Sequence, residues 1–197
     1  MICLASASPR RKALLEQIGV SATVMPCDID ETVHAGEPAE VYVERMAREK
    51  AAAACSRAVG QVILAADTVV VCAGHILGKP ADRAEALATL RVLSGNEHQV
   101  MTAVAVRLQQ RERVIRVDTR VRFRQLTDAE MSAYWNTGEP ADKAGSYAIQ
   151  GLGAVFVERI EGSYSAVVGL PLLETAAVLA EFGVSCWQRS RAEPGER

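Results

Sequence analysis

The chain begins MICLASASPRRKALL (residues 1–15), where a short apolar segment runs directly into two serines, a proline and two adjacent arginines. Residues 2–5 predict a short buried strand. Pro9 suits the first turn of a helix, which residues 11–18 continue until Gly19 ends it. A strand that leads at once into a helix predicts a protein in which the two kinds of element are mixed.

Strands and helices intermingle along the rest of the chain. Helices are predicted over residues 38–59, 82–93, 128–136 and 171–182, and further strands over residues 21–26, 62–72, 100–108, 114–123 and 154–160. The strands over residues 100–108 and 114–123 alternate and are joined by a polar turn, so they predict an antiparallel hairpin. The expected fold class is therefore α/β, with a mixed twisted sheet flanked by helices.

Composition places the chain among ordinary globular proteins. It has 197 residues, 49% of them hydrophobic and 23% charged, with a net charge of −2. This length suits one sizeable core, and we expect one domain over residues 1–188 and a disordered tail over residues 189–197. The slightly acidic balance argues against nucleic acid as a partner, because binding to a phosphate backbone usually needs a basic surface.

The cysteines and the apolar runs bear on location. Five cysteines are scattered in odd number without a C-x-x-C pair, which is typical of reduced thiols in a reducing compartment. The best apolar run, residues 62–73, is interrupted by Asp67 and Thr68 and is far shorter than the roughly 20 residues of a membrane helix. We expect a cytoplasmic protein that is not embedded in a membrane.

The turn over residues 5–11 (ASASPRR) is the first candidate site. A strand end that leads into a helix start offers free backbone N–H groups and the positive end of a helix dipole, which together attract anions. Ser6 and Ser8 add hydroxyl donors, and Arg10 and Arg11 add guanidinium groups that can hold phosphate oxygens in pairs. The alternative is a capped surface helix with solvated arginines.

Asp67, within the stretch LAADTVVVC, is the second candidate. A carboxylate in an apolar strand is costly to desolvate unless a cation or a metal meets it. Asp67 is therefore expected to contact a metal or a lysine, or to act as a general base. The alternative is an aspartate at the end of the strand that binds the backbone of a turn.

The chain has only four lysines against eighteen arginines. Lys50 falls on the apolar stripe of its predicted helix, where an ammonium group needs an anion nearby, and Lys79 follows the apolar strand within the tripeptide GKP. Both could face the same phosphates as the arginines. The alternative for each lysine is that its apolar stem carries the charge out to solvent.

Two further stretches carry polar groups suited to a nucleotide. Glu31 lies in the acidic stretch CDIDETVH, whose oxygen ligands suit Mg²⁺ or Mn²⁺; the alternative is a polar loop. Gln150 lies among glycines in DKAGSYAIQGLGAVFV, and its amide can pair with the edge of a nucleobase. Because that amide can flip, it cannot by itself separate uracil from cytosine. The alternative is a glycine-rich turn with an exposed amide.

Taken in order, these stretches resemble the Maf family of nucleotide pyrophosphatases. The motifs that carry the resemblance, which spans about residues 2–182, are LASASPRR, DIDE, MAREKA, LAADTVV, GKP, LSGNEHQVMTAVAV, DKAGSYAIQGLG and GSYSAVVGLPL. The resemblance implies a fold of the inosine triphosphate pyrophosphatase type, with two lobes around a cleft. It also implies metal-assisted hydrolysis of a nucleoside triphosphate to the monophosphate and pyrophosphate by a cytoplasmic protein, often a homodimer.

The resemblance assigns roles at matching positions. It implies that Asp67 is the proton acceptor and that Arg10, Thr68 and Gln150 govern the choice of substrate. With glutamine at position 150, the chain resembles the branch of the family that acts on dTTP and UTP. Modified pyrimidine triphosphates are further candidate substrates. We expect Ser6, Arg10, Arg11, Lys50 and Lys79 to bind phosphates, and Glu31 and Asp67 to hold a divalent metal cation. Whether Asp67 acts chiefly as base or as ligand stays open.

Three other activities are compatible with the same motifs. One is hydrolysis of 7-methyl-GTP, the substrate of a sister branch that tends to carry glutamate at the position of Gln150. A second is hydrolysis of inosine or other damaged nucleotides on the same fold. The third is a nucleotide-binding regulator of septum formation with little catalysis. The combination of Asp67, Glu31 and two lysines favours an enzyme.

Overall fold

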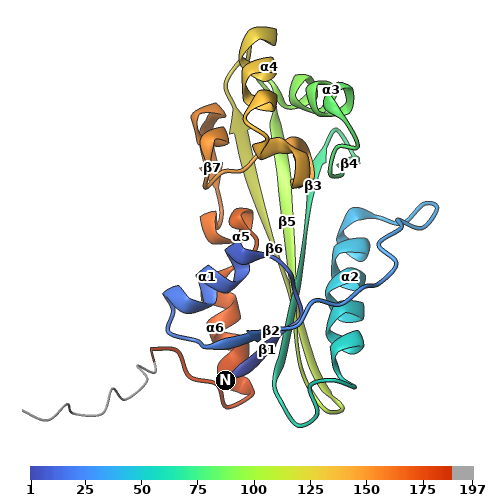
Figure 1. The fold of residues 1–197 in the computed structure, drawn as a ribbon, viewed down its shortest axis with the longest axis vertical. Helices are drawn as coiled ribbons and strands as arrows, with labels where there is room; N and C mark the ends of the chain where they lie inside the picture. The colour runs from blue at the N-terminus through green and yellow to red at the C-terminus, as the bar shows by residue number, and fades with distance from the viewer. Residues whose placement is uncertain (188–197) are drawn as a thin grey trace, which may run out of the picture.

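A computed structural model describes residues 1–187, so the predicted tail over residues 189–197 lies outside the described residues. The molecule is an elongated mixed α/β structure in which three long strands run along most of its length (Figure 1). The predicted fold class, a mixed sheet flanked by helices, is confirmed.

The elements follow one another in mixed order. The strands are β1 (Ile2–Leu4), β2 (Ala22–Val24), β3 (Ile63–Cys72), β4 (His75–Leu77), β5 (Glu97–Leu108), β6 (Arg111–Phe123) and β7 (Val157–Glu161). The helices are α1 (Pro9–Gln17), α2 (Ala39–Ala54), α3 (Arg83–Leu93), α4 (Asp128–Asn136), α5 (Tyr164–Val168) and α6 (Leu172–Glu181). Three short 3₁₀ segments, η1 (Glu139–Asp142), η2 (Ala144–Ser146) and η3 (Leu152–Phe156), lie between α4 and β7.

The seven strands form one sheet in the order β2-β1-β3-β5-β6-β7, with β4 paired to β3. Strand β1 runs parallel to β2 and β3, whereas β3, β5, β6 and β7 are antiparallel neighbours. The central strand β3 therefore joins the parallel and the antiparallel parts. Its register against β5 places Thr68 opposite Thr102.

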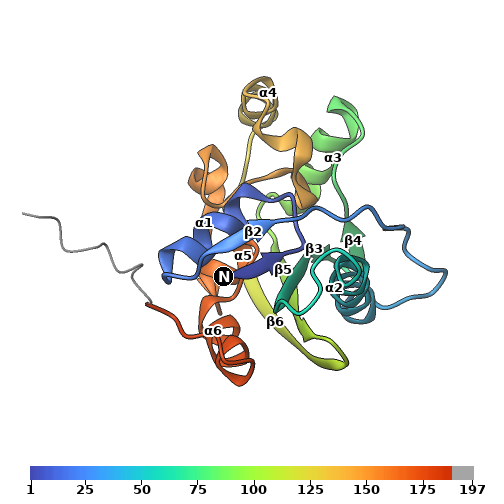
Figure 2. The ribbon, with the colours of Figure 1, turned by 60° about the horizontal axis from the view of Figure 1, so that its bottom comes forward.

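Alternate residues of β3 point to opposite faces of the sheet, and each face has its own core. Ala65 and Val69 face α2, whose buried alanines let the helix pack closely on the sheet. Ala66 and Val70 belong to the larger core on the other face, which includes residues of α1, α3, α4 and α6. Figure 2 shows α2 and α6 on different sides of the sheet. Asp67 consequently faces α2, and Thr68 faces the larger core.

Local chemistry sets several of the predicted boundaries. Ser8 caps α1 by accepting a hydrogen bond from the Arg11 backbone N–H. Thr127 and Glu130 form a complete capping box at the start of α4, the helix expected over residues 128–136. None of the helices within residues 1–187 combines the length and the apolar character needed to cross a bilayer.

Some boundaries differ from the prediction. The strand expected over residues 154–160 begins only at Val157, because the preceding residues form the 3₁₀ segment η3. That segment is fixed by the Glu139 carboxylate, which accepts a hydrogen bond from the Leu152 backbone N–H. The helix expected over residues 38–59 ends at Ala54. Strand β4 and helix α5 were not predicted, since three and five residues are too short to show a period.

Candidate active site

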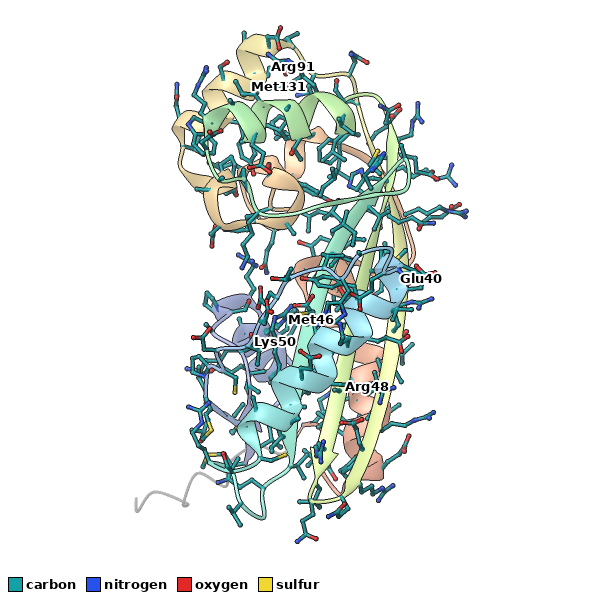
Figure 3. The ribbon with its side chains drawn as sticks, turned by 90° about the vertical axis from the view of Figure 1, so that its right-hand side faces the viewer. Glu40, Met46, Arg48, Lys50, Arg91 and Met131 are labelled. Atoms are coloured by element: carbon teal, nitrogen blue, oxygen red, sulfur yellow. The ribbon has the colours of Figure 1, made fainter. Side chains whose placement is uncertain are left out.

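A cavity of about 500 Å³ opens beside β3 and is bounded by the turn before α1, by α2 and by the loop that holds η2. Figure 3 labels Lys50, which α2 contributes to this cavity. Residues far apart in the chain meet here. The lining includes every site residue predicted from the sequence: Ser6, Arg10, Arg11, Glu31, Lys50, Asp67, Thr68, Lys79 and Gln150.

Asp67 lies at the cavity wall on the α2 side of the sheet and is buried. Lys50 Nζ lies 2.7 Å from Asp67 Oδ1 and 2.7 Å from Glu31 Oε1, so one ammonium group bridges two carboxylates. The lysine reaches this position because it replaces an apolar residue on the buried stripe of α2. Of the alternatives raised by the sequence, the structure shows a lysine partner for Asp67 and an anion partner for Lys50.

The loop that carries Glu31 is tied to α2 by Tyr42, whose hydroxyl donates to the Glu31 carbonyl at 2.9 Å. Burial by itself raises the pKa of the Glu31 carboxyl, but the hydrogen bond and charge of Lys50, with the charges of Lys79 and Arg11, outweigh it, and the pKa is lowered. Burial, together with the negative charges of Asp67 and Glu31, raises the pKa of Tyr42 to about 12. Glu31 is therefore held as a carboxylate, and Tyr42 as a neutral phenol.

The turn between β1 and α1 is organised around Ser6. Its hydroxyl oxygen accepts hydrogen bonds from the Ser8 backbone N–H at 3.2 Å and from Arg11 Nη1 at 3.1 Å. Arg11 also donates from Nε to the Gly169 carbonyl at 2.9 Å and from Nη2 to Thr68 Oγ1 at 3.2 Å. Three of its five N–H hydrogens are thus used within the protein, and two are left for a ligand.

Burial lowers the pKa of the Arg11 guanidinium, an effect that the negative charge of Asp67 opposes. The position of this group is fixed from three sides, because its acceptors come from the turn, from β3 and from the segment after α5. Arg11 therefore connects separate parts of the fold in addition to lining the cavity.

Arg10, Lys79 and Gln150 differ from the residues above. Within residues 1–187, their side chains make no hydrogen bond or ion pair with the protein, although all three line the cavity. Lys79 and Gln150 are exposed, and Arg10 is half-buried. Two cations and one amide are thus available to a ligand.

The loops that carry Lys79 and Gln150 are connected at Gly145. Its backbone N–H donates to the Gly78 carbonyl at 3.1 Å. Gly145 has a φ of +71°, and an added Cβ would lie 2.9 Å from Val70 Cγ2, so both its conformation and its packing against β3 require glycine.

Sequence reasoning gave no role to Asp142 and Lys143, which also line the cavity. The Lys143 side chain is 13% exposed and pairs with Asp142. The scarcity of lysine was the available signal, since Lys143 is one of only four. With this pair, the lining carries five cationic and three carboxylate side chains, an excess of positive charge in a chain whose net charge is −2.

Glu31 and Asp67 are the carboxylates that would hold a divalent metal, with further ligands from outside the protein. Glu31 and Asp67 converge on one cation position, held here by the Lys50 ammonium. No group of three or more histidine, cysteine, aspartate or glutamate residues suited to a metal occurs within the described residues. Mg²⁺ is commonly held by one or two carboxylates together with substrate phosphates, and this donor set matches that pattern.

Most of the sequence of this chain matches known proteins. Residues 1–182 match the family described as Maf-like protein. The chain is 53% identical over 191 residues to a dTTP/UTP pyrophosphatase of Myxococcus xanthus (strain DK1622), which covers 96% of this chain and 97% of the relative. It is 50% identical over 189 residues to a dTTP/UTP pyrophosphatase of Hahella chejuensis (strain KCTC 2396), with 94% of each chain covered.

Proposed function

The chain belongs to the Maf family, and from this membership we propose that it hydrolyses dTTP and UTP to the nucleoside monophosphate and pyrophosphate. In this reaction, the oxygen of a water forms a bond to the α-phosphorus, and the bond to the bridging oxygen of the β-phosphate breaks. The water oxygen stays with the monophosphate, and pyrophosphate leaves. The expected class of enzyme is a nucleoside triphosphate pyrophosphohydrolase.

The single structural observation that supports hydrolysis at a phosphate is the carboxylate of Asp67 in a cavity with an excess of cations. Lys50 binds Asp67 Oδ1, and no donor among the described residues binds the other oxygen, Oδ2. Asp67 is thereby oriented by one oxygen while the other can accept a proton from water. Hydrolysis at phosphorus depends largely on positioning and charge neutralisation, and this arrangement supplies both.

We assign the phosphates to the basic groups of the cavity. Arg10 and Lys79 have no protein partner among residues 1–187, so they are the cations most available to a triphosphate. Arg11 can offer its two remaining N–H groups, and Ser6 can offer its hydroxyl proton, since the Ser6 oxygen acts as an acceptor in both of its contacts.

Glu31 and Asp67 would hold a divalent cation, Mg²⁺ or Mn²⁺, together with phosphate oxygens. When bound, such a metal supplies neutralisation of the negative charge on the phosphates. Lys50 would then share the two carboxylates with the metal. The lowered pKa of Glu31 supports this role, because a metal ligand has to be deprotonated.

Base selection is assigned to Arg10, Thr68 and Gln150. All three line the cavity, and the Gln150 amide is free of protein partners among the described residues. An amide both donates and accepts, so it can pair with the alternating groups on a pyrimidine edge.

A substrate panel tests the proposal. The purified full chain is incubated with dTTP, UTP, CTP, GTP, 7-methyl-GTP and ITP, with Mg²⁺ or Mn²⁺, and nucleotides and pyrophosphate are followed by chromatography. We expect dTTP and UTP to give monophosphate and pyrophosphate at the highest kcat/KM. Preference for 7-methyl-GTP or ITP, or binding of nucleotide without turnover, would refute the proposed function in favour of the corresponding alternative.

Location and assembly stay predictions. The cytoplasmic location rests on the cysteine pattern, and the homodimer rests on the family resemblance. Light scattering of the purified chain tests the homodimer, and a single-chain mass would contradict it.

A further inference from the structure

Thr102 lies directly behind the cavity and is fully buried on β5. It is the cross-strand partner of Thr68, which lines the cavity from β3. The two hydroxyl oxygens are 3.0 Å apart. Thr102 does not itself line the cavity, so any effect on a ligand has to pass through Thr68.

The direction of each hydrogen bond follows from the number of protons. Thr102 Oγ1 lies 2.7 Å from the Ala166 carbonyl oxygen, and a carbonyl can only accept, so Thr102 donates its single proton there. In the contact between the threonines, Thr102 must then accept and Thr68 must donate. Arg11 Nη2 donates to Thr68 Oγ1 at 3.2 Å.

The four groups therefore form a chain of hydrogen bonds with one polarity, from Arg11 through Thr68 and Thr102 to the Ala166 carbonyl. Thr68 donates its only hydroxyl proton to Thr102 and has none left for a ligand. A hydroxyl oxygen has two lone pairs, and Arg11 uses one of them. Thr68 lines the cavity, and the hydrogen-bonding capacity left to its hydroxyl is one acceptor position and no donor.

We propose that Thr102 is a positioning residue that fixes Thr68 as an acceptor, and that this acceptor selects a base with a ring N–H, uracil or thymine, against cytosine. The inference rests on the proposed function. Uracil and thymine carry a hydrogen on N3, whereas N3 of cytosine is an acceptor and would face a second lone pair. The Gln150 amide can flip to suit either base, so a fixed acceptor supplies the discrimination that the glutamine lacks.

The test compares kcat/KM for UTP and CTP in Thr102→Val and Thr102→Ser. In Thr102→Val, Thr68 loses its acceptor, and its proton becomes free for N3 of cytosine. The ratio of kcat/KM for UTP to that for CTP should fall about tenfold, the effect of one mismatched hydrogen bond, whereas Thr102→Ser should retain the ratio. An unchanged ratio in Thr102→Val, including an equal loss on both substrates, would overturn the inference.

Thr175→Val is the matched control. Thr175 is also fully buried, and its hydroxyl has no partner among residues 1–187. The same substitution there should leave the UTP to CTP ratio unchanged. A similar fall in this variant would mean that the ratio responds to any buried valine, and the role of Thr102 would be lost.

Two further measurements test the inference if the Thr102→Val variant does not fold. Thr68→Val removes the acceptor from the cavity side and should lower the same ratio, whereas Thr68→Ser should retain it. The unmodified chain should use UTP at least about tenfold better than CTP or N3-methyl-UTP, which lack the N3 hydrogen. Comparable use of all three overturns the inference alone, whereas failure to hydrolyse UTP and dTTP overturns the proposed function.

Discussion

Asp67 and Thr68 are neighbours on β3, yet the two faces of the strand that they occupy are built differently. On the α2 face, Asp67 is surrounded by charges, with Lys50 shared between two carboxylates. On the opposite face, Thr68 belongs to a chain of hydrogen bonds in which the hydroxyl groups are neutral and already paired. The charged face, that of Asp67, can stabilise a changing charge on phosphorus. The paired face, that of Thr68, offers a fixed hydrogen-bond acceptor and therefore distinguishes ligands by where their donors lie.

Asp67→Asn removes the carboxylate from the charged face and should have the largest effect. An amide keeps the shape but cannot take a proton from water, so kcat for UTP should fall roughly 10²-fold or more. Steady-state kinetics at matched metal concentration measure it, with circular dichroism as the folding control. Near-normal turnover would remove Asp67 from the proposed reaction and leave the charged face without a catalytic role.

Lys50→Met removes the bridging cation and should lower kcat/KM by about tenfold or more, whereas Lys50→Arg should lose less because it keeps the charge. In the native chain, burial favours protonation of Glu31, and Lys50 outweighs it. Without the lysine, the pKa of Glu31 rises, so the acidic limb of the pH–rate profile should move to higher pH. A profile whose limb stays in place in Lys50→Met would show that Glu31 ionisation does not limit activity.

Gln150→Glu places a negative charge in the cavity that Thr68 also lines. Glutamate only accepts, as do O2 and O4 of uracil, so kcat/KM for UTP and dTTP should fall about fivefold to tenfold relative to GTP. Gln110→Glu, an exposed change in the hairpin between β5 and β6, supplies the matched control. If preference among dTTP, UTP and GTP is the same in both variants, Gln150 does not read the base.

His98, a buried residue on the same face of the sheet as Thr102, should affect stability and not activity. Its Nε2 contacts the Tyr147 hydroxyl at 2.9 Å, and burial lowers its pKa from 6.5 to about 4. Between these pH values the unfolded chain binds a proton that the folded chain does not, so stability falls as pH falls. Over this pH range the shifted pKa of His98 lowers the free energy of unfolding by about 3 kcal/mol.

His98→Gln should remove that part of the pH dependence, as measured by urea unfolding across the same pH range. His75→Gln is the control, because His75 is exposed on β4. Equal pH dependence in the native chain and in His98→Gln would mean that His98 does not stay neutral in the folded state.

The two faces of β3 differ in how well their site residues can be predicted from the sequence. Asp67 and Lys50 interrupt apolar patterns, so their burial and their need for partners can be inferred from spacing alone. Thr102 interrupts nothing, since threonine is common in strands, and its role depends on which residue stands opposite on β3. That register is a tertiary property, set by the sheet as a whole.

The same distinction holds for the fold. Capping residues predict the start of α4 because their hydrogen bonds are local. Residues 154–156 were expected to be strand but belong to the 3₁₀ segment η3. The sequence pattern does not show this, because the Glu139 carboxylate that fixes η3 comes from thirteen residues before Leu152. Lys143 was visible as a rare lysine, but only the folded loop shows that it reaches the cavity.

The contact between Gly145 and Gly78 makes one mechanical unit of two loops. Outward movement of either loop alone breaks this backbone hydrogen bond, and outward movement of the loop that holds η2 also lifts Gly145 from Val70. A nucleotide that draws Lys79 inward through its phosphates would therefore carry Gln150 with it. Selectivity for the base should then depend on the number of phosphates. The protein should distinguish bases less strictly in nucleoside diphosphates than in nucleoside triphosphates.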